Sequence, residues 1–223
     1  MHVSRQTELH AVWWKCVINQ ISSIAGISAI KKVLAIWKEN ESNGDEKFWQ
    51  DTLQEYSFVL SQVFSFPVVV LKGKAYIGGK GIEGTGGKET DYLLQNVVSL
   101  HALIVEIKTP LTHLLLATPY RPPDVYATSR DVSGAVVQVS GYKDEFLKRF
   151  YPLSGQSDQK FRVADPPCML IIGHSSQLDS DAKRASFELF RRGQRVMEII
   201  TFDELFKKIE LLLSLLEGGG RQQ

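Results

Sequence analysis

Apolar residues recur at intervals of three and four positions in the part of the chain before Pro67. This spacing is typical of helices that bury one face. It predicts helices within residues 6–40, interrupted by the serines and the glycine at 22–26, and another helix over residues 46–64. The polar run ENESNGDE between them predicts a linker.

The repeat of apolar positions changes to two residues from Pro67 onward, which indicates β-strands. PVVVLKGKAYIGG predicts a strand that could fold back as a hairpin, and a glycine-rich loop follows at 78–88. TDYLLQN and LHALIVEIKTP predict two further strands, the second closed by Pro110. Only a few residues separate these two strands, so they should pair as an antiparallel hairpin.

Helix and strand patterns alternate in the remainder of the chain. They predict a helix over residues 131–149, a wholly apolar strand at 168–173, an amphipathic helix over 179–193 and a strand at 195–201. Thr201 and Glu204 have the spacing of a capping box, which would open a last helix that ends near Leu216. This order of elements predicts an α/β fold with a mixed central sheet flanked by helices. We expect a helical appendage at 1–45, a main domain at 46–217 and a flexible tail at 218–223.

Composition narrows the class of protein only slightly. The chain has 223 residues, of which 43% are hydrophobic and 23% charged, as in ordinary soluble globular proteins. A net charge of +1 neither indicates a basic nucleic-acid coat nor excludes a local basic groove. The two cysteines, Cys16 and Cys168, argue against a disulfide scaffold and a cysteine-based zinc site. The sequence contains no signal-peptide pattern and no run of about 18 apolar residues, so we expect a cytoplasmic protein without a membrane partner.

Two charged residues interrupt the apolar strand LIVEIKTP. Glu106 and Lys108 are two positions apart, so a strand would project both side chains from the same face. Ionised groups seldom lie among apolar neighbours unless they are paired, bound to a metal or exposed at a site. A solvated Glu-x-Lys pair on the sheet surface is the alternative interpretation. Asp91 lies on the preceding strand, and the hairpin can bring its carboxylate to the same end as Glu106.

Two carboxylates and an ammonium group suit a site for a hard cation. Mg²⁺ prefers oxygen ligands, keeps several waters and is commonly held by one or two carboxylates together with a substrate phosphate. Asp91 and Glu106 supply the carboxylates, and the backbone carbonyl of Ile107 could supply another oxygen. Such a metal can lower the pKa of a bound water. Lys108 could then position that water and stabilise charge that develops on phosphorus.

A further motif follows on the next predicted helix, where Gln138 and Tyr142 are four positions apart and so share a face. Asp91, Glu106-x-Lys108 and Gln138-x-x-x-Tyr142 stand in the order found in the PD-(D/E)xK nuclease superfamily, and most resemble its exonuclease branch with a Gln-x-x-x-Tyr helix. The longer stretch of sequence from residue 46 to about residue 215 resembles the Shedu anti-phage defence nucleases. The segments that carry this resemblance are FWQ (48–50), GGKGIEGTGGKETDYLL (78–94), LIVEIKTP (103–110) and SGAVVQVSGYK (133–143).

The resemblance implies a restriction-endonuclease-like core and a Mg²⁺-dependent deoxyribonuclease, a phosphodiester hydrolase, in which Mn²⁺ can replace Mg²⁺. Asp91 and Glu106 would bind the metal, and Lys108 would contact and position the attacking water. Gln138 and Tyr142 would line the site and contact the DNA backbone or orient the metal ligands.

Many superfamily members add a carboxylate from the helix before the sheet, and either Glu46 or Glu55 could fill that role. One departure concerns the proline of the superfamily name, because Glu89 and Thr90 precede Asp91 here. Other interpretations are a nuclease-like module that binds DNA or protein without cleavage, and a restriction or repair nuclease of the same superfamily. The resemblance and the tryptophans of the N-terminal helices (Trp13, Trp14 and Trp37) also suggest a homo-oligomer.

Overall fold

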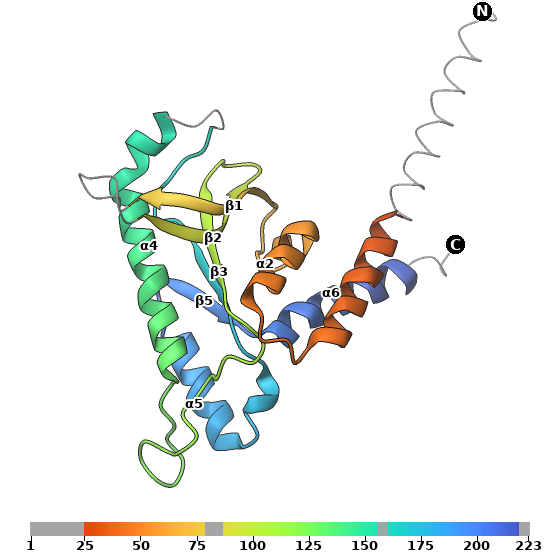
Figure 1. Cartoon of the computed structure of the whole chain (residues 1–223), viewed down its shortest axis with the longest axis vertical. Coiled ribbons are helices and arrows are strands. Elements are labelled where there is room, and N and C mark those ends of the chain that lie inside the picture. The colour runs from red at the N-terminus through yellow and green to blue at the C-terminus, as the bar shows by residue number, and fades with distance from the viewer. Residues whose placement is uncertain (1–24, 79–86, 156–159, 219–223) are drawn as a thin grey trace, which may run out of the picture. The chain divides into compact units, whose positions relative to one another are not determined.

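A five-stranded mixed sheet flanked by helices forms the centre of the protein (Figure 1). The computed structural model describes residues 25–78, 87–155 and 160–218. The strands lie side by side in chain order: β1 (Val68–Gly78), β2 (Lys88–Asn96), β3 (Ala102–Ile107), β4 (Cys168–Ile171) and β5 (Met197–Ile200). The first three strands pair antiparallel, and the last three pair parallel. The predicted α/β fold with a mixed sheet is confirmed.

The predicted hairpin is formed by β2 and β3, in which Tyr92 pairs with Val105. The turn between them is held by the side chain of Asn96, which accepts hydrogen bonds from the backbone N–H groups of Val98 and Ser99. β3 ends at Ile107, earlier than the predicted end at Pro110. Because the turn lies at the other end, the ends of the hairpin that carry Asp91 and Glu106 are free to meet side chains from the flanking helices.

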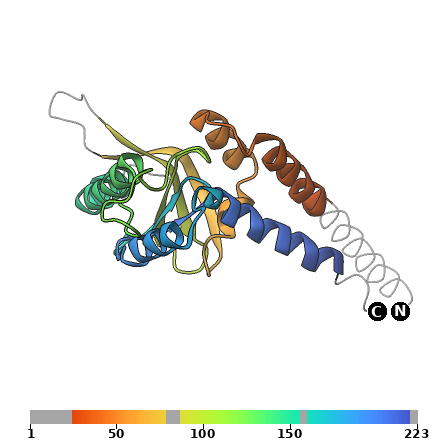
Figure 2. The ribbon, with the colours of Figure 1, turned by 90° about the horizontal axis from the view of Figure 1, so that it is seen from below.

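Helices cover both faces of the sheet, as the two views in Figures 1 and 2 show. α4 (Arg130–Gly155) and α5 (Asp181–Arg192) pack on one face, where Val139, Phe146 and Phe187 join Ile104 and Leu170 in the apolar core. α2 (Glu46–Glu55) lies on the other face. This helix therefore approaches the hairpin from the side opposite to α4.

Local capping determines where α2 begins. Asp45 is its N-cap, and its side chain accepts a hydrogen bond from the backbone N–H of Lys47 at 2.9 Å. Glu46 is consequently the first helical residue. The indole of Trp49 is fully buried against Phe202 and Phe206, and this packing anchors the helix.

The prediction of one continuous helix over 46–64 is wrong. α2 ends at Glu55, a turn follows, and α3 is the short helix Phe58–Ser61. With this break, Val59 and Leu60 are adjacent in sequence and both fully buried. Apolar periodicity cannot detect such a change of direction, because both pieces keep helical spacing.

The remaining element boundaries follow the predictions within a few residues. α4 continues to Gly155, beyond the predicted end at 149, and α5 begins after the N-cap Ser180. A short 3₁₀ helix, η1 (Ser175–Gln177), was not predicted. α6 (Phe202–Gly218) starts as expected, because the carboxylate of Glu204 accepts a hydrogen bond from the backbone N–H of Thr201 at 2.9 Å, one of the two bonds of a capping box.

The chain divides into two compact units. One consists of residues 41–207 and contains the sheet. In the other, the helix of residues 25–40 accompanies the final part of α6, and Lys31 and Glu217 form an ion pair at 2.8 Å. None of the helices in the described ranges has the length and apolar character needed to cross a bilayer. The predictions for residues 6–24, most of the glycine-rich loop and nearly all of the tail lie outside the described residues.

Candidate functional site

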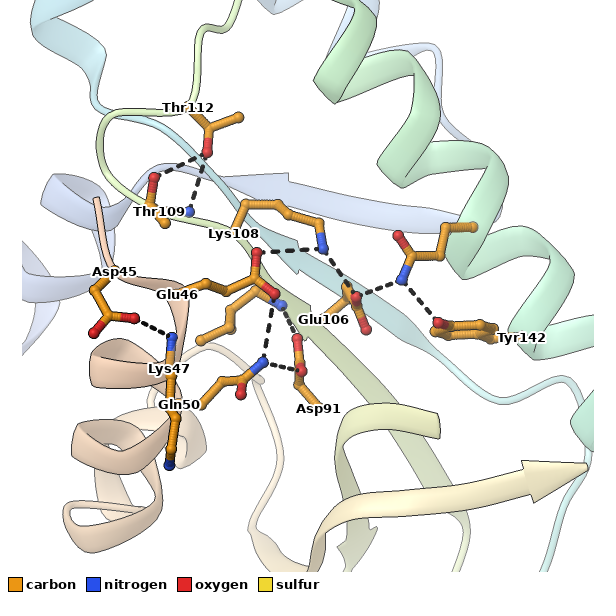
Figure 3. Close-up of polar contacts among 12 residues, drawn as sticks. Asp45, Glu46, Lys47, Gln50, Asp91, Glu106, Lys108, Thr109, Thr112 and Tyr142 are labelled. Carbon is orange, nitrogen blue, oxygen red and sulfur yellow. Dashed lines mark hydrogen bonds and ion pairs between the residues drawn. The ribbon is translucent and has the colours of Figure 1, made fainter. Parts of the chain in front are cut away.

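The predicted site residues converge at the open end of the β2–β3 hairpin (Figure 3). Asp91 comes from β2 and Glu106 from β3, with Lys108 immediately after that strand. Gln138 and Tyr142 project from α4 on one side. Glu46, at the start of α2, reaches the same place from the other side.

Both carboxylate oxygens of Asp91 accept hydrogen bonds. Oδ2 accepts from the backbone N–H of Ile107 at 2.9 Å, and Oδ1 accepts from Nε2 of Gln50 at 2.6 Å. The side chain is nearly buried, with Asp91 9% exposed. Burial raises the pKa of Asp91 and outweighs the opposing effects of the Ile107 hydrogen bond and of Lys108. The carboxylate is thus held in place but is short of compensating positive charge.

Glu106 is the most deeply buried acidic group of the site, at 3% exposed. Its Oε1 accepts from Nζ of Lys108 at 3.2 Å and from Nε2 of Gln138 at 2.8 Å. Its Oε2 is buried and has no hydrogen-bond partner among the described residues. Burial, followed by the charge of Asp91, raises the pKa of Glu106 to about 7 despite the nearby ammonium. An ionised Glu106 therefore lacks one polar partner.

Lys108 lies between two acidic residues, as Figure 3 shows. Its Nζ is 3.2 Å from Oε1 of Glu106 and 3.6 Å from Oε2 of Glu46. Burial lowers the pKa of the Lys108 amine, but attraction to Glu106 and Glu46 outweighs burial and the net pKa is raised. The side chain is 20% exposed and carries an ammonium group at neutral pH.

The contribution of α4 follows from helical spacing. Gln138 and Tyr142 are one turn apart, and Nε2 of Gln138 donates to the Tyr142 hydroxyl oxygen at 2.8 Å as well as to Glu106. The amide thus ties α4 to β3 and orients the buried carboxylate. Burial raises the pKa of the Tyr142 phenol, so its hydroxyl stays protonated at neutral pH.

The two acidic residues proposed from the preceding helix have different positions. Glu46 lies beside Lys108, whereas Glu55 is the last residue of α2 and is exposed at the far end of the helix. Sequence reasoning missed Gln50, whose amide reaches Asp91 at 2.6 Å and Glu46 at 3.5 Å. Its position four residues after Glu46 could have indicated a shared helical face.

A cleft of about 600 Å³ opens onto this cluster. Its lining includes Glu46, Lys108 and Gln138, and it extends along the start of α4 to Arg130 and to His113. Within the described ranges, no group of three or more His, Cys, Asp or Glu side chains is arranged to hold a metal ion. The protein therefore offers a pair of buried carboxylates beside a cleft rather than a complete cage.

Comparison with known proteins places this sequence in a family. The family described as Shedu protein SduA, C-terminal, matches residues 43–206, which include the whole cluster. The Shedu protein SduA of Bacillus cereus (strain B4264) is 39% identical over 207 residues, covering 90% of this chain. The chain spans 54% of the length of that relative. The protein therefore belongs to the Shedu SduA C-terminal family.

Proposed function

We propose that this chain is a Mg²⁺-dependent deoxyribonuclease with a PD-(D/E)xK core, acting in bacterial anti-phage defence. The observation that carries the proposal is the cluster of Asp91, Glu106 and Lys108, in which two nearly buried carboxylates lie on adjacent strands and an ammonium group follows the second strand. The resemblance to the Shedu defence nucleases and the family match over the same residues support the defence role.

The donor set fits a hard divalent cation. Burying carboxylates with raised pKa values costs free energy unless positive charge compensates them, and Lys108 supplies only one such charge. Oε2 of Glu106 is a buried oxygen with no partner among the described residues. Mg²⁺ is satisfied by one or two carboxylates, waters and substrate phosphate, so a complete protein cage is not required. Asp91, Glu106 and the carbonyl of Ile107 would hold it.

When bound, the metal would activate a water and neutralise charge on the phosphate. Each residue then has a defined role in hydrolysis, in which water adds to phosphorus and one P–O ester bond breaks. In the metal-free protein the pKa of Lys108 is raised by Glu106 and Glu46, so its amine carries a proton at neutral pH. Its ammonium hydrogens would hold the attacking water and stabilise the charge on the phosphoryl oxygens. Gln138 keeps the Glu106 carboxylate oriented through its 2.8 Å hydrogen bond.

The cleft suits a nucleic-acid backbone. Its lining holds the cations Lys108 and Arg130 and the imidazole of His113, which would contact phosphates that flank the scissile one, and also the carboxylates of Glu46 and Asp131. The net charge of +1 means that this local arrangement, rather than overall charge, must attract DNA.

The test is a cleavage assay on supercoiled and linear DNA with Mg²⁺, with Mn²⁺ and with EDTA. Metal-dependent cutting should occur in the wild type and be lost in Glu106→Gln and Lys108→Ala, both shown to be folded by circular dichroism. Glu55→Gln is the matched control, since it removes an exposed carboxylate from α2. Glu46→Gln tests the carboxylate that lies beside Lys108.

Cutting that survives both Glu106→Gln and Lys108→Ala would refute the assignment of the site. A wild type that binds DNA but does not cut it under any of these conditions would support the alternative of a nuclease-like binding module. Cutting that depends on a short recognition sequence would instead favour a restriction enzyme over a defence nuclease of the Shedu kind.

A further inference from the structure

Gln50 is the last residue of the FWQ segment and links α2 to the acidic cluster, and no role in the site has been assigned to it above. Its Nε2 donates to Oδ1 of Asp91 at 2.6 Å and lies 3.5 Å from Oε1 of Glu46 (Figure 3). Its own backbone carbonyl accepts a hydrogen bond from the hydroxyl of Tyr92, the residue next to Asp91 on β2. Two hydrogen bonds thus join this one residue to neighbouring positions of the same strand.

We propose that Gln50 is a positioning residue that holds Asp91 and Glu46 ready for a divalent cation. This inference rests on the metal-dependent function proposed above. A primary amide has two N–H donors, so one nitrogen can serve two carboxylates at once. Each carboxylate oxygen keeps a further lone pair, and a hydrogen bond from Gln50 therefore leaves Asp91 able to bind a metal. Outer-shell donors of this kind orient the carboxylates that bind metals.

The position of Glu46 explains why such an anchor is needed. Its side chain is 41% exposed at the first position of α2, and its ion pair with Lys108 is long, at 3.6 Å. Exposed ion pairs of this kind contribute little to holding a side chain in one place. The bonds made by Gln50 to Asp91 and by Tyr92 to Gln50 fix α2 against β2, and so determine where Glu46 lies relative to the buried carboxylates.

The experiment measures Mn²⁺ affinity without DNA, by titrating the protein and following the electron paramagnetic resonance signal of free Mn²⁺. Gln50→Met keeps the length of the side chain but removes both donors. It should raise the dissociation constant for Mn²⁺ by roughly 10- to 100-fold. Gln54→Met is the matched control, with the same substitution one turn later on α2 at an exposed position, and it should leave the affinity unchanged.

A double-mutant cycle separates positioning from general damage to the fold. If Gln50 acts through Asp91, the effect of Gln50→Met should shrink to less than threefold in an Asp91→Asn background, because the carboxylate that it orients is then absent. DNA cleavage by Gln50→Met should be weak at low metal concentration and recover when Mn²⁺ is raised. A merely structural defect would not recover in this way. Gln50→Ala serves as the second variant if methionine does not fold.

The outcomes distinguish this inference from the proposed function. A wild type that binds Mn²⁺ and cuts DNA, together with a folded Gln50→Met or Gln50→Ala of unchanged affinity, overturns the role of Gln50 alone. An equal loss of affinity in Gln54→Met also overturns it, because the effect would then belong to the helix and not to this amide. A wild type that neither binds Mn²⁺ nor cuts DNA overturns both proposals together.

Discussion

Replacing Glu106 by glutamine should make the metal-free protein more stable at alkaline pH, although it removes a residue of the site. Glutamine keeps the size of the side chain and an oxygen that can accept the hydrogen bond of Gln138. It cannot ionise, so the cost of burying a carboxylate with one unpartnered oxygen disappears. The stability of this variant therefore tests whether the buried, ionised carboxylate of Glu106 destabilises the metal-free protein.

The size of the effect follows from the pKa of Glu106, which is about 7 in the folded protein and 4.5 ordinarily. Because the folded state binds the proton more tightly, stability is highest at low pH. It falls as pH rises from about 4.5 to 7, and the full cost is present above pH 7. A difference of about 2.5 between the two pKa values corresponds to about 3 kcal/mol. The pKa of about 7 already includes the attraction between Glu106 and Lys108, so we expect a gain of about 3 kcal/mol, or roughly 6–12 °C in Tm.

The assay is urea and thermal unfolding of the wild type, Glu106→Gln and the exposed control Glu55→Gln, in EDTA at pH 5, 6, 7 and 8. We expect Glu106→Gln to exceed the wild type at pH 8, and the difference to vanish or reverse at pH 5. Added Mg²⁺ should stabilise the wild type and leave Glu106→Gln nearly unchanged. A variant that is less stable than the wild type by the same amount at every pH would refute the reasoning, because Glu106 would then be a well-compensated ionised group.

Three other substitutions test separate parts of the structure. Lys108→Met should lower cleavage by roughly 100-fold or more in a metal-saturated assay, since it removes the ammonium proposed to stabilise charge on the phosphate, whereas the exposed control Lys148→Met should not. Gly173→Ala should cost about 2 kcal/mol or more in urea unfolding, because φ is 68° and an added Cβ would lie 2.5 Å from a buried leucine methyl. The control Gly141→Ala has open space around its Cβ and should be neutral or slightly stabilising. Trp49→Ala should cost about 3–5 kcal/mol in the same measurement, because its indole is fully buried against two phenylalanines of α6; a cost below 1 kcal/mol would contradict that packing.

The position of Gln50 shows where sequence reasoning ended. Its amide is 41 positions from Asp91, and nothing in the local pattern of FWQ indicates a partner at that distance. The sequence also could not show whether Glu46 or Glu55 supplies the additional carboxylate of the site, because both lie on one predicted helix. The packing of Trp49 and the cap at Asp45 decide which end of α2 meets the hairpin.

By itself, the sequence determined the order of the elements, the mixed sheet and the pairing of β2 with β3, because periodicity and short connections are local properties. It also indicated the carboxylates of Asp91 and Glu106, since charged groups in an apolar strand need a partner or a site. Only the tertiary structure decided how deeply these carboxylates are buried, which residues contact them and where α2 breaks. Burial and pKa depend on every group that surrounds a side chain, and those groups come from helices far apart in the sequence.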